Sequence, residues 1–97
     1  MRKREAKMPK FVIERDMPGV GELSPEQLRD AAALSSKVVG ELGPEIHWLT
    51  SYITTDKVYC VFVAPDHDIL LEHARCAGFP VDRISKVVTT IDPSSAE

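Results

Sequence analysis

The side chains of this sequence that could do chemistry beyond packing are three histidines and two cysteines. They are His47, His67, His73, Cys60 and Cys76. Imidazole and thiolate groups bind borderline metal ions such as nickel, copper and zinc, and imidazole also transfers protons near neutral pH. None of the five belongs to a strong motif, because the sequence has no C-x-x-C pair, glycine-rich phosphate loop or G-x-S-x-G turn. Their chemistry therefore depends on how the fold places them.

His73 and Cys76 form the best candidate pair for a metal ion. They are three residues apart in a predicted helix, so their side chains are expected to be neighbours on one helical face. Two ligands do not complete a site, and a third would come from Cys60, from Glu72 or from a second copy of the chain. The alternative is that His73 is a core histidine with a hydrogen bond to a tyrosine or backbone oxygen, and that Cys76 fills a small apolar gap.

The remaining histidines lie in a strand and at a helix start. His47 and Trp48 are consecutive in a predicted strand, so they are expected to face opposite sides, with Tyr52 on the Trp48 side. If Trp48 faces the core, His47 faces solvent. The segment Asp66-His67-Asp68 groups oxygen and nitrogen donors at a helix start, but helix capping explains both aspartates without an ion.

Six elements are expected to position these residues. They are strands over 10–15, 46–54, 57–64 and 84–91 and helices over 24–42 and 66–77. The order strand, helix, strand, strand, helix, strand predicts an α+β fold, a ferredoxin-like βαββαβ sandwich. Its four-stranded antiparallel sheet carries both helices on one face.

A homodimer is expected because the strand over 57–64 is too apolar for a sheet covered on one side. Residues 58–64 contain no charge, and two helices cover only one face. One alternating set of side chains would therefore be open to water in a monomer. Burying each such side chain in a dimer interface would stabilise the dimer by about 1.5 to 3 kcal/mol. The two alternative sets are Tyr59, Val61 and Val63, or Val58, Cys60 and Phe62.

Composition and charge exclude several classes of function. The net charge is −3, and four of the 12 basic residues lie within residues 1–7, so the rest of the chain is acidic and repels nucleic acid and anionic lipid. No run approaches the roughly 18 apolar residues of a membrane span, and the charged residues 1–7 lack the apolar run of a signal peptide. The sequence therefore predicts a cytoplasmic protein with free thiols that binds neither nucleic acid nor membrane.

The domain boundaries follow from where the periodic pattern begins and ends. Because that pattern begins only after Met8, residues 1–7 are predicted to be an unstructured basic extension. Residues 8–92 form the ferredoxin-like domain, and residues 93–97 form a C-terminal tail.

Six short segments share their order and spacing with a known family over the chain from about Met8 to Asp92. They are Trp48-x-x-Ser51-Tyr52, Asp56-Lys57-x-Tyr59-Cys60-Val61, Ala64-Pro65, Glu72-His73-Ala74-Arg75, Gly78-Phe79-Pro80 and Ile91-Asp92-Pro93. Together they resemble the small bacterial nickel-binding ferredoxin-like proteins, formerly a domain of unknown function. The resemblance implies a dimer that binds nickel in metal homeostasis or sequestration, and it does not imply an enzyme.

The match to this family is incomplete in the second strand. The family pattern has a histidine just before the Ser-Tyr pair, where this sequence has Thr50, and His47 lies three residues upstream instead. His73 does match the family pattern, as a candidate ligand or a conformational anchor. The leading prediction is therefore a non-catalytic, nickel-preferring homodimer with His73 as first ligand, followed by Cys76, Cys60 and His47.

Two other functions fit the same sequence. One is a small enzyme of the dimeric α+β barrel type, a cofactor-independent monooxygenase or an isomerase. Its pocket would lie between helices and sheet, with His73 as acid and base and with Trp48 and Tyr52 or Tyr59 as walls. The other is a structural or regulatory dimer without a ligand.

Overall fold

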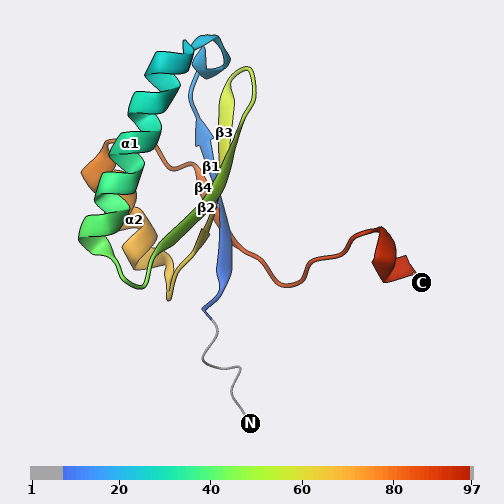
Figure 1. Ribbon diagram of the computed structural model, residues 1–97. Coiled ribbons are helices and arrows are strands. Elements are labelled where there is room, and N and C mark those ends of the chain that lie inside the picture. Colours follow the sequence, from blue (N-terminus) through green and yellow to red (C-terminus); the bar gives the residue numbers. More distant parts are fainter. Residues whose placement is uncertain (1–7, 97) are drawn as a thin grey trace.

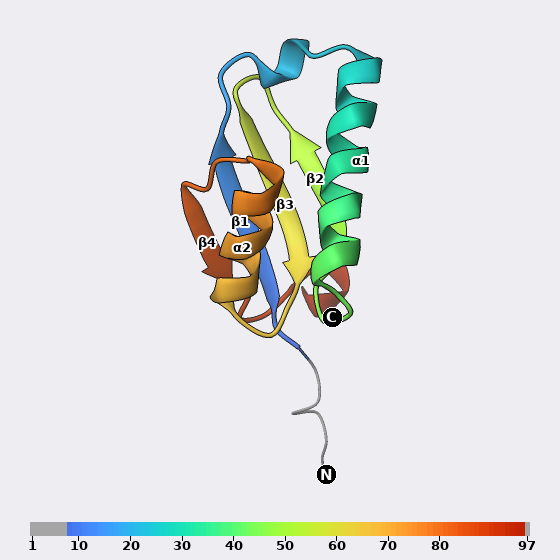
Figure 2. The same ribbon diagram turned by 90° about the vertical axis from the view of Figure 1, so that its left-hand side faces the viewer.

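The computed structural model of the protein describes residues 8–96, so the predicted basic extension lies outside the described residues. The elements are β1 (Lys10–Asp16), the short 3-10 helix η2 (Val20–Glu22), α1 (Pro25–Leu42), β2 (His47–Ile53), β3 (Lys57–Val63), α2 (His67–Ala77), β4 (Arg83–Lys86) and the 3-10 helix η3 (Pro93–Ala96). The strands form one antiparallel sheet in the order β2-β3-β1-β4. Both helices cover the same face of this sheet (Figures 1 and 2). The predicted ferredoxin-like α+β fold is confirmed.

Local sequence explains where both helices begin. Ser24 accepts a hydrogen bond from the backbone N–H of Gln27, and the Gln27 side chain accepts one from the backbone of Ser24, so α1 begins in a reciprocal capping box. The Asp66 carboxylate accepts from the backbone N–H of Ile69 at the start of α2. Gly78 ends α2 in the left-handed conformation with φ of 77°.

Strand alternation divides the sheet into a helix-covered face and an open face. Phe11 and Ile13 of β1 and Cys60 and Phe62 of β3 point under the helices and are almost fully buried. The open face, opposite the helices, contains the half-buried side chains Val12, Tyr59, Val61 and Val63. Of the two sets that the sequence left open, Tyr59, Val61 and Val63 is therefore the one without cover from a helix.

A bulge in β2 changes which side chains share a face. Trp48 pairs with Phe62 and Thr50 pairs with Val61, so Leu49 is the extra residue of β2. Beyond the bulge Tyr52 pairs with Tyr59 on the open face. The prediction that Tyr52 lies on the Trp48 side was wrong, because the bulge reverses the alternation.

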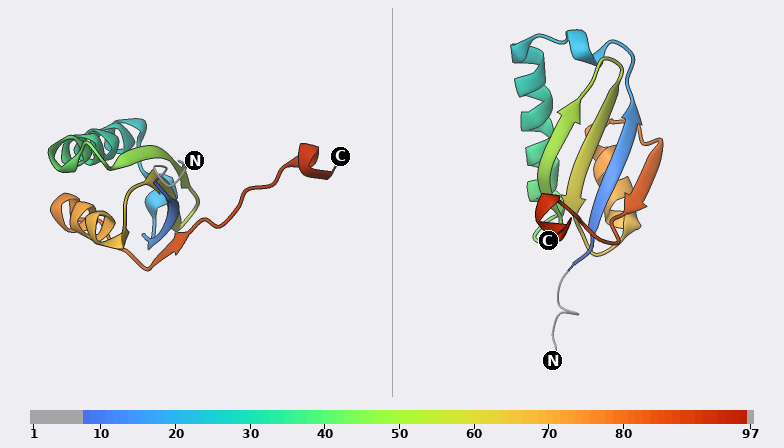
Figure 3. Two further views of the ribbon diagram at one scale, coloured as in Figure 1. Left: turned by 90° about the horizontal axis from the view of Figure 1, so that it is seen from below. Right: turned by 90° about the vertical axis from the view of Figure 1, so that its right-hand side faces the viewer.

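The last strand is shorter than predicted. It ends at Lys86 instead of Ile91, and its register with β1 ends at the pair of Phe11 and Lys86. Val87 donates its N–H to the carbonyl of Lys10, and the chain then leaves the sheet. Residues 87–96 run away from the body on the side opposite the helices (Figures 1 and 3).

Candidate functional site

His73 lies in the core between the two helices and the sheet. Its side chain has no exposed surface, its Nε2 lies 3.2 Å from the Ser35 hydroxyl on α1, and its ring packs edge-on against Phe62 at 5.2 Å. Burial lowers the pKa of the imidazole, the hydrogen bond with the Ser35 carbonyl raises it, and the charge of Arg15 lowers it, with a net shift downwards. Its Nδ1 has no hydrogen-bond partner within residues 8–96. This geometry makes His73 a neutral link between α2 and α1.

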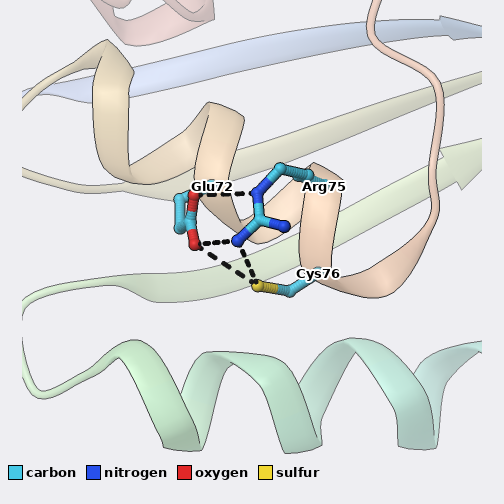
Figure 4. Close-up of polar contacts among 3 residues, drawn as sticks. All are labelled: Glu72, Arg75 and Cys76. Carbon is cyan, nitrogen blue, oxygen red and sulfur yellow. Dashed lines mark hydrogen bonds and ion pairs between the residues drawn. The ribbon is translucent and has the colours of Figure 1, made fainter.

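Cys76 lies on the exposed side of α2, although it follows His73 by only three residues. Its thiol is 3.6 Å from a Glu72 carboxylate oxygen and 3.6 Å from Nη2 of Arg75 (Figure 4). Arg75 and Glu72 form an ion pair, which lowers the pKa of Glu72 and raises that of Arg75. His73 and Cys76 therefore do not face a common point.

Cys60 is buried in β3 beside a cation. Its sulfur accepts hydrogen bonds from the Ser51 hydroxyl at 3.0 Å and from Nε of Arg15 at 3.4 Å. The indole N–H of Trp48 donates in turn to the Ser51 hydroxyl at 2.9 Å. A guanidinium at this distance repels a divalent metal ion, so the surroundings of Cys60 disfavour it as a nickel ligand.

His47 is exposed on the open face at the start of β2, opposite Val63 of β3. Because of the bulge, Thr50 lies on the same face, next to Val61. The exposed His67 at the start of α2 instead packs its ring edge-on against Phe11 at 5.2 Å, and the neighbouring Asp66 caps the helix.

The four predicted ligands are consequently not brought together in one chain. Among residues 8–96, no group of three or more His, Cys, Asp and Glu side chains is arranged to hold a metal ion. His73 and Cys60 are buried at separate points beneath the helices, Cys76 lies on the outer side of α2, and His47 lies on the open face.

A cavity of about 120 Å³ lies between α1 and the helix-covered face of the sheet. Trp48 lines this cavity, as the enzyme hypothesis predicts, but His73, Tyr52 and Tyr59 are not among its walls. His73 reaches only Ser35, which does line it. The cavity is therefore not lined by the histidine and the tyrosines that the enzyme hypothesis predicts.

Arg15 is the wall residue that the sequence reasoning missed. It is 2% exposed and continues the buried series of Phe11 and Ile13 in β1. The signal was present in the sequence, because alternation places a charged residue at the third core-facing position of that strand. A charge at such a position is rare in a core unless it has a partner.

Comparison with known proteins decides the family. The sequence model of a family described as nickel responsive protein SCO4226-like matches residues 11–87. The chain belongs to this family. No protein with a curated description matches the sequence. The resemblance seen in the sequence is thus confirmed.

The SCO4226-like fold is found in a solved structure as well. The crystal structure of SCO4226 from Streptomyces coelicolor A3(2) superposes with a TM-score of 0.72 and 19% sequence identity, over 84% of this chain and 99% of that chain. At this identity the likeness shows the fold, and it assigns no ligand. In the part of the chain that the structure describes, no helix is long and apolar enough to cross a membrane.

The bulge in β2 places His47 and Thr50 on the same face of the sheet. Residues three apart in a regular strand lie on opposite faces, but the extra residue Leu49 places His47 and Thr50 on the same open face. His47 is therefore exposed on the same face as Thr50, three residues nearer the start of the strand.

Proposed function

We propose that this protein binds nickel without catalysing a reaction, and that it does so in the cytoplasm as a pair of identical chains joined through the open face. The description of the family as nickel responsive supports the metal. The single observation that carries the location of the site is the exposed His47 on the open face, beside the apolar side chains that a second chain would cover.

The dimer is supported by the composition of the open face and of the C-terminal segment. Val12, Val61 and Val63 form an apolar strip across β1 and β3 that no helix covers. On the same side, residues 87–96 project from the body and expose 94% of Val88 and 78% of Ile91. Such surfaces are unfavourable in water, and a second copy with the same strip and the same projecting segment covers both by two-fold symmetry.

Two-fold symmetry also addresses the shortage of metal ligands in a single chain. A dimer through the open face brings the His47 imidazoles of both chains to one interface, and nickel accepts imidazole nitrogen readily. Glu14 and Asp16 of β1 also lie on the open face, opposite Tyr59 and Lys57 in the register of β1 and β3. His73, by contrast, has no exposed surface, so a metal ion could reach it only if the helices separated.

Calorimetric titration of the tag-free protein with Ni²⁺ tests this proposal. We expect binding in the native chain and at least about tenfold weaker binding in His47→Ala, because loss of a ligand costs no less than loss of its supporting hydrogen bond. His67→Ala is the matched control, since His67 is also exposed but lies on α2. It should bind as the native chain does.

The outcomes separate the parts of the proposal. Equal heats in the native chain and in His47→Ala would remove His47 from the site. An absence of heat in the native chain would contradict nickel binding. The remaining hypothesis would then be a dimer without a ligand, which sedimentation tests.

A further inference from the structure

Arg15 is a buried cation, and its hydrogen bonds and ring contact within residues 8–96 are with neutral groups. Its guanidinium donates from Nη1 to the carbonyl of Pro80 at 2.8 Å and from Nε to the sulfur of Cys60 at 3.4 Å, and it lies 5.4 Å from the centre of the Phe79 ring. Within residues 8–96, no Asp or Glu forms an ion pair with it. Buried charges are ordinarily paired, because a carbonyl and a thiol offset only part of the lost hydration. Among the described residues, no carboxylate therefore compensates the positive charge of Arg15.

This cation forms part of the wall of the cavity under α1. Most of the other walls are apolar, contributed by α1, by the η2 segment and by the core-facing side chains of the sheet, and the cavity is partly open. Besides Arg15, the side chains in the wall that can form hydrogen bonds are Ser35, Ser51, Cys60 and Trp48. An engineered cavity of roughly 150 Å³ holds a benzene ring. This cavity, at about 120 Å³, is somewhat smaller, but because it is partly open it can take a single ring or a short branched chain.

We propose that the cavity binds a small apolar carboxylate, of the size of benzoate, with its carboxylate on Arg15 and its apolar part beneath α1. A guanidinium matches a carboxylate with two parallel hydrogen bonds, and the hydrogen bonds described for Arg15 leave Nη2 unused. The Ser51 hydroxyl beside it, already within reach of Cys60 and Trp48, offers a further polar contact.

The chemistry of the walls selects this class of ligand over others. A phosphate carries more charge and needs more donors than one guanidinium and two hydroxyls provide in an apolar cavity. A divalent cation is repelled by Arg15. This site is therefore separate from the nickel site on the open face, and the two proposals stand or fall independently.

Trp48 makes the proposal measurable, because it is the only tryptophan in the chain and it lines the cavity. We would titrate the protein with benzoate, with benzyl alcohol as a neutral ligand of similar size, and with inorganic phosphate. Fluorescence and the indole N–H resonance of Trp48 report occupancy. We expect saturable binding of benzoate, at least about tenfold weaker binding of benzyl alcohol, and none of phosphate, because a charged hydrogen-bonded pair is strong when desolvated.

Two kinds of variant test the site itself. Arg15→Met keeps the length of the side chain, removes the charge, and should weaken benzoate by at least about tenfold while leaving benzyl alcohol little changed. Ala32→Leu fills the cavity from α1 and should abolish binding of both ligands. Ala33→Leu is its control, since Ala33 is the next residue of α1, is exposed and does not line the cavity.

The proposal fails if benzoate leaves the Trp48 signals unchanged, or if benzoate and benzyl alcohol bind equally. It also fails if Ala32→Leu and Ala33→Leu bind benzoate alike, which would place the ligand elsewhere. Tighter binding of phosphate than of benzoate would assign Arg15 to an inorganic anion and overturn the apolar carboxylate. Because Ala32→Leu leaves Arg15 in place, the test holds even if Arg15→Met does not fold.

Discussion

The two faces of the sheet are built from alternate residues of the same strands, yet they differ in what covers them. In β1, Ile13 is completely buried under the helices, whereas its neighbour Val12 on the open face is only half-buried. The helix-covered face holds the core and the buried cation Arg15, and the open face holds an apolar strip and His47. The covered face thus contains the core of the chain, whereas the open face leaves an apolar strip that no helix covers.

The largest effect that tests this comparison is expected from truncating adjacent residues of β1. Ile13→Ala should lower the free energy of unfolding by about 2 to 5 kcal/mol, because it leaves a cavity at a fully buried position. Val12→Ala should cost less than about 1 kcal/mol in the monomer, since Val12 already contacts water. Denaturant titration at low protein concentration measures both. Equal losses would show that the open face is as well packed as the core.

If the proposed dimer forms through the open face, a charge there should separate it with little effect on the fold of each chain. Val61 lies at the centre of the apolar strip between Val12 and Thr50. Val61→Asp would bury a carboxylate without a partner at the interface and should raise the dimer Kd by about 100-fold. Sedimentation over a range of concentrations measures the Kd, and Ala33→Asp on the exposed side of α1 is the control. A native chain that sediments as a monomer at micromolar concentration would remove the interface.

Most of the fold could be predicted from the sequence because its signals are local. The capping box at Ser24, the left-handed Gly78 and the strand alternation in β1 each depend on a few neighbouring residues. The bulge at Leu49 could not be predicted, because it depends on how β2 pairs with β3. The early end of β4 could not be predicted either, because it depends on how far β4 pairs with β1.

The candidate site was harder to predict than the fold, because helical spacing does not give the depth of a side chain. His73 and Cys76 are neighbours by spacing. However, His73 lies on the buried side of α2, and Cys76 lies on the side exposed to solvent. Arg15 was overlooked because a lone charge in a strand is read as solvent-facing. The predicted nickel ligands and the dimer remain predictions.

The smallest effect concerns His73, and it tests whether the covered face stays closed when its histidine gains a proton. Burial lowers the pKa of His73 in the folded chain, so below its ordinary value near 6.5 the unfolded chain binds a proton that the folded chain does not. The contribution of neutral His73 to the free energy of unfolding is therefore complete above pH 6.5. It is lost as the pH falls, by at most about 1.4 kcal/mol per pH unit. His73→Leu should remove this slope between pH 6.5 and 5, where the carboxylates with lowered pKa values, Glu72 and Asp92, stay ionised. His67→Gln should keep it, and a slope that survives in His73→Leu would place the acid sensitivity of the fold outside the contact between α1 and α2.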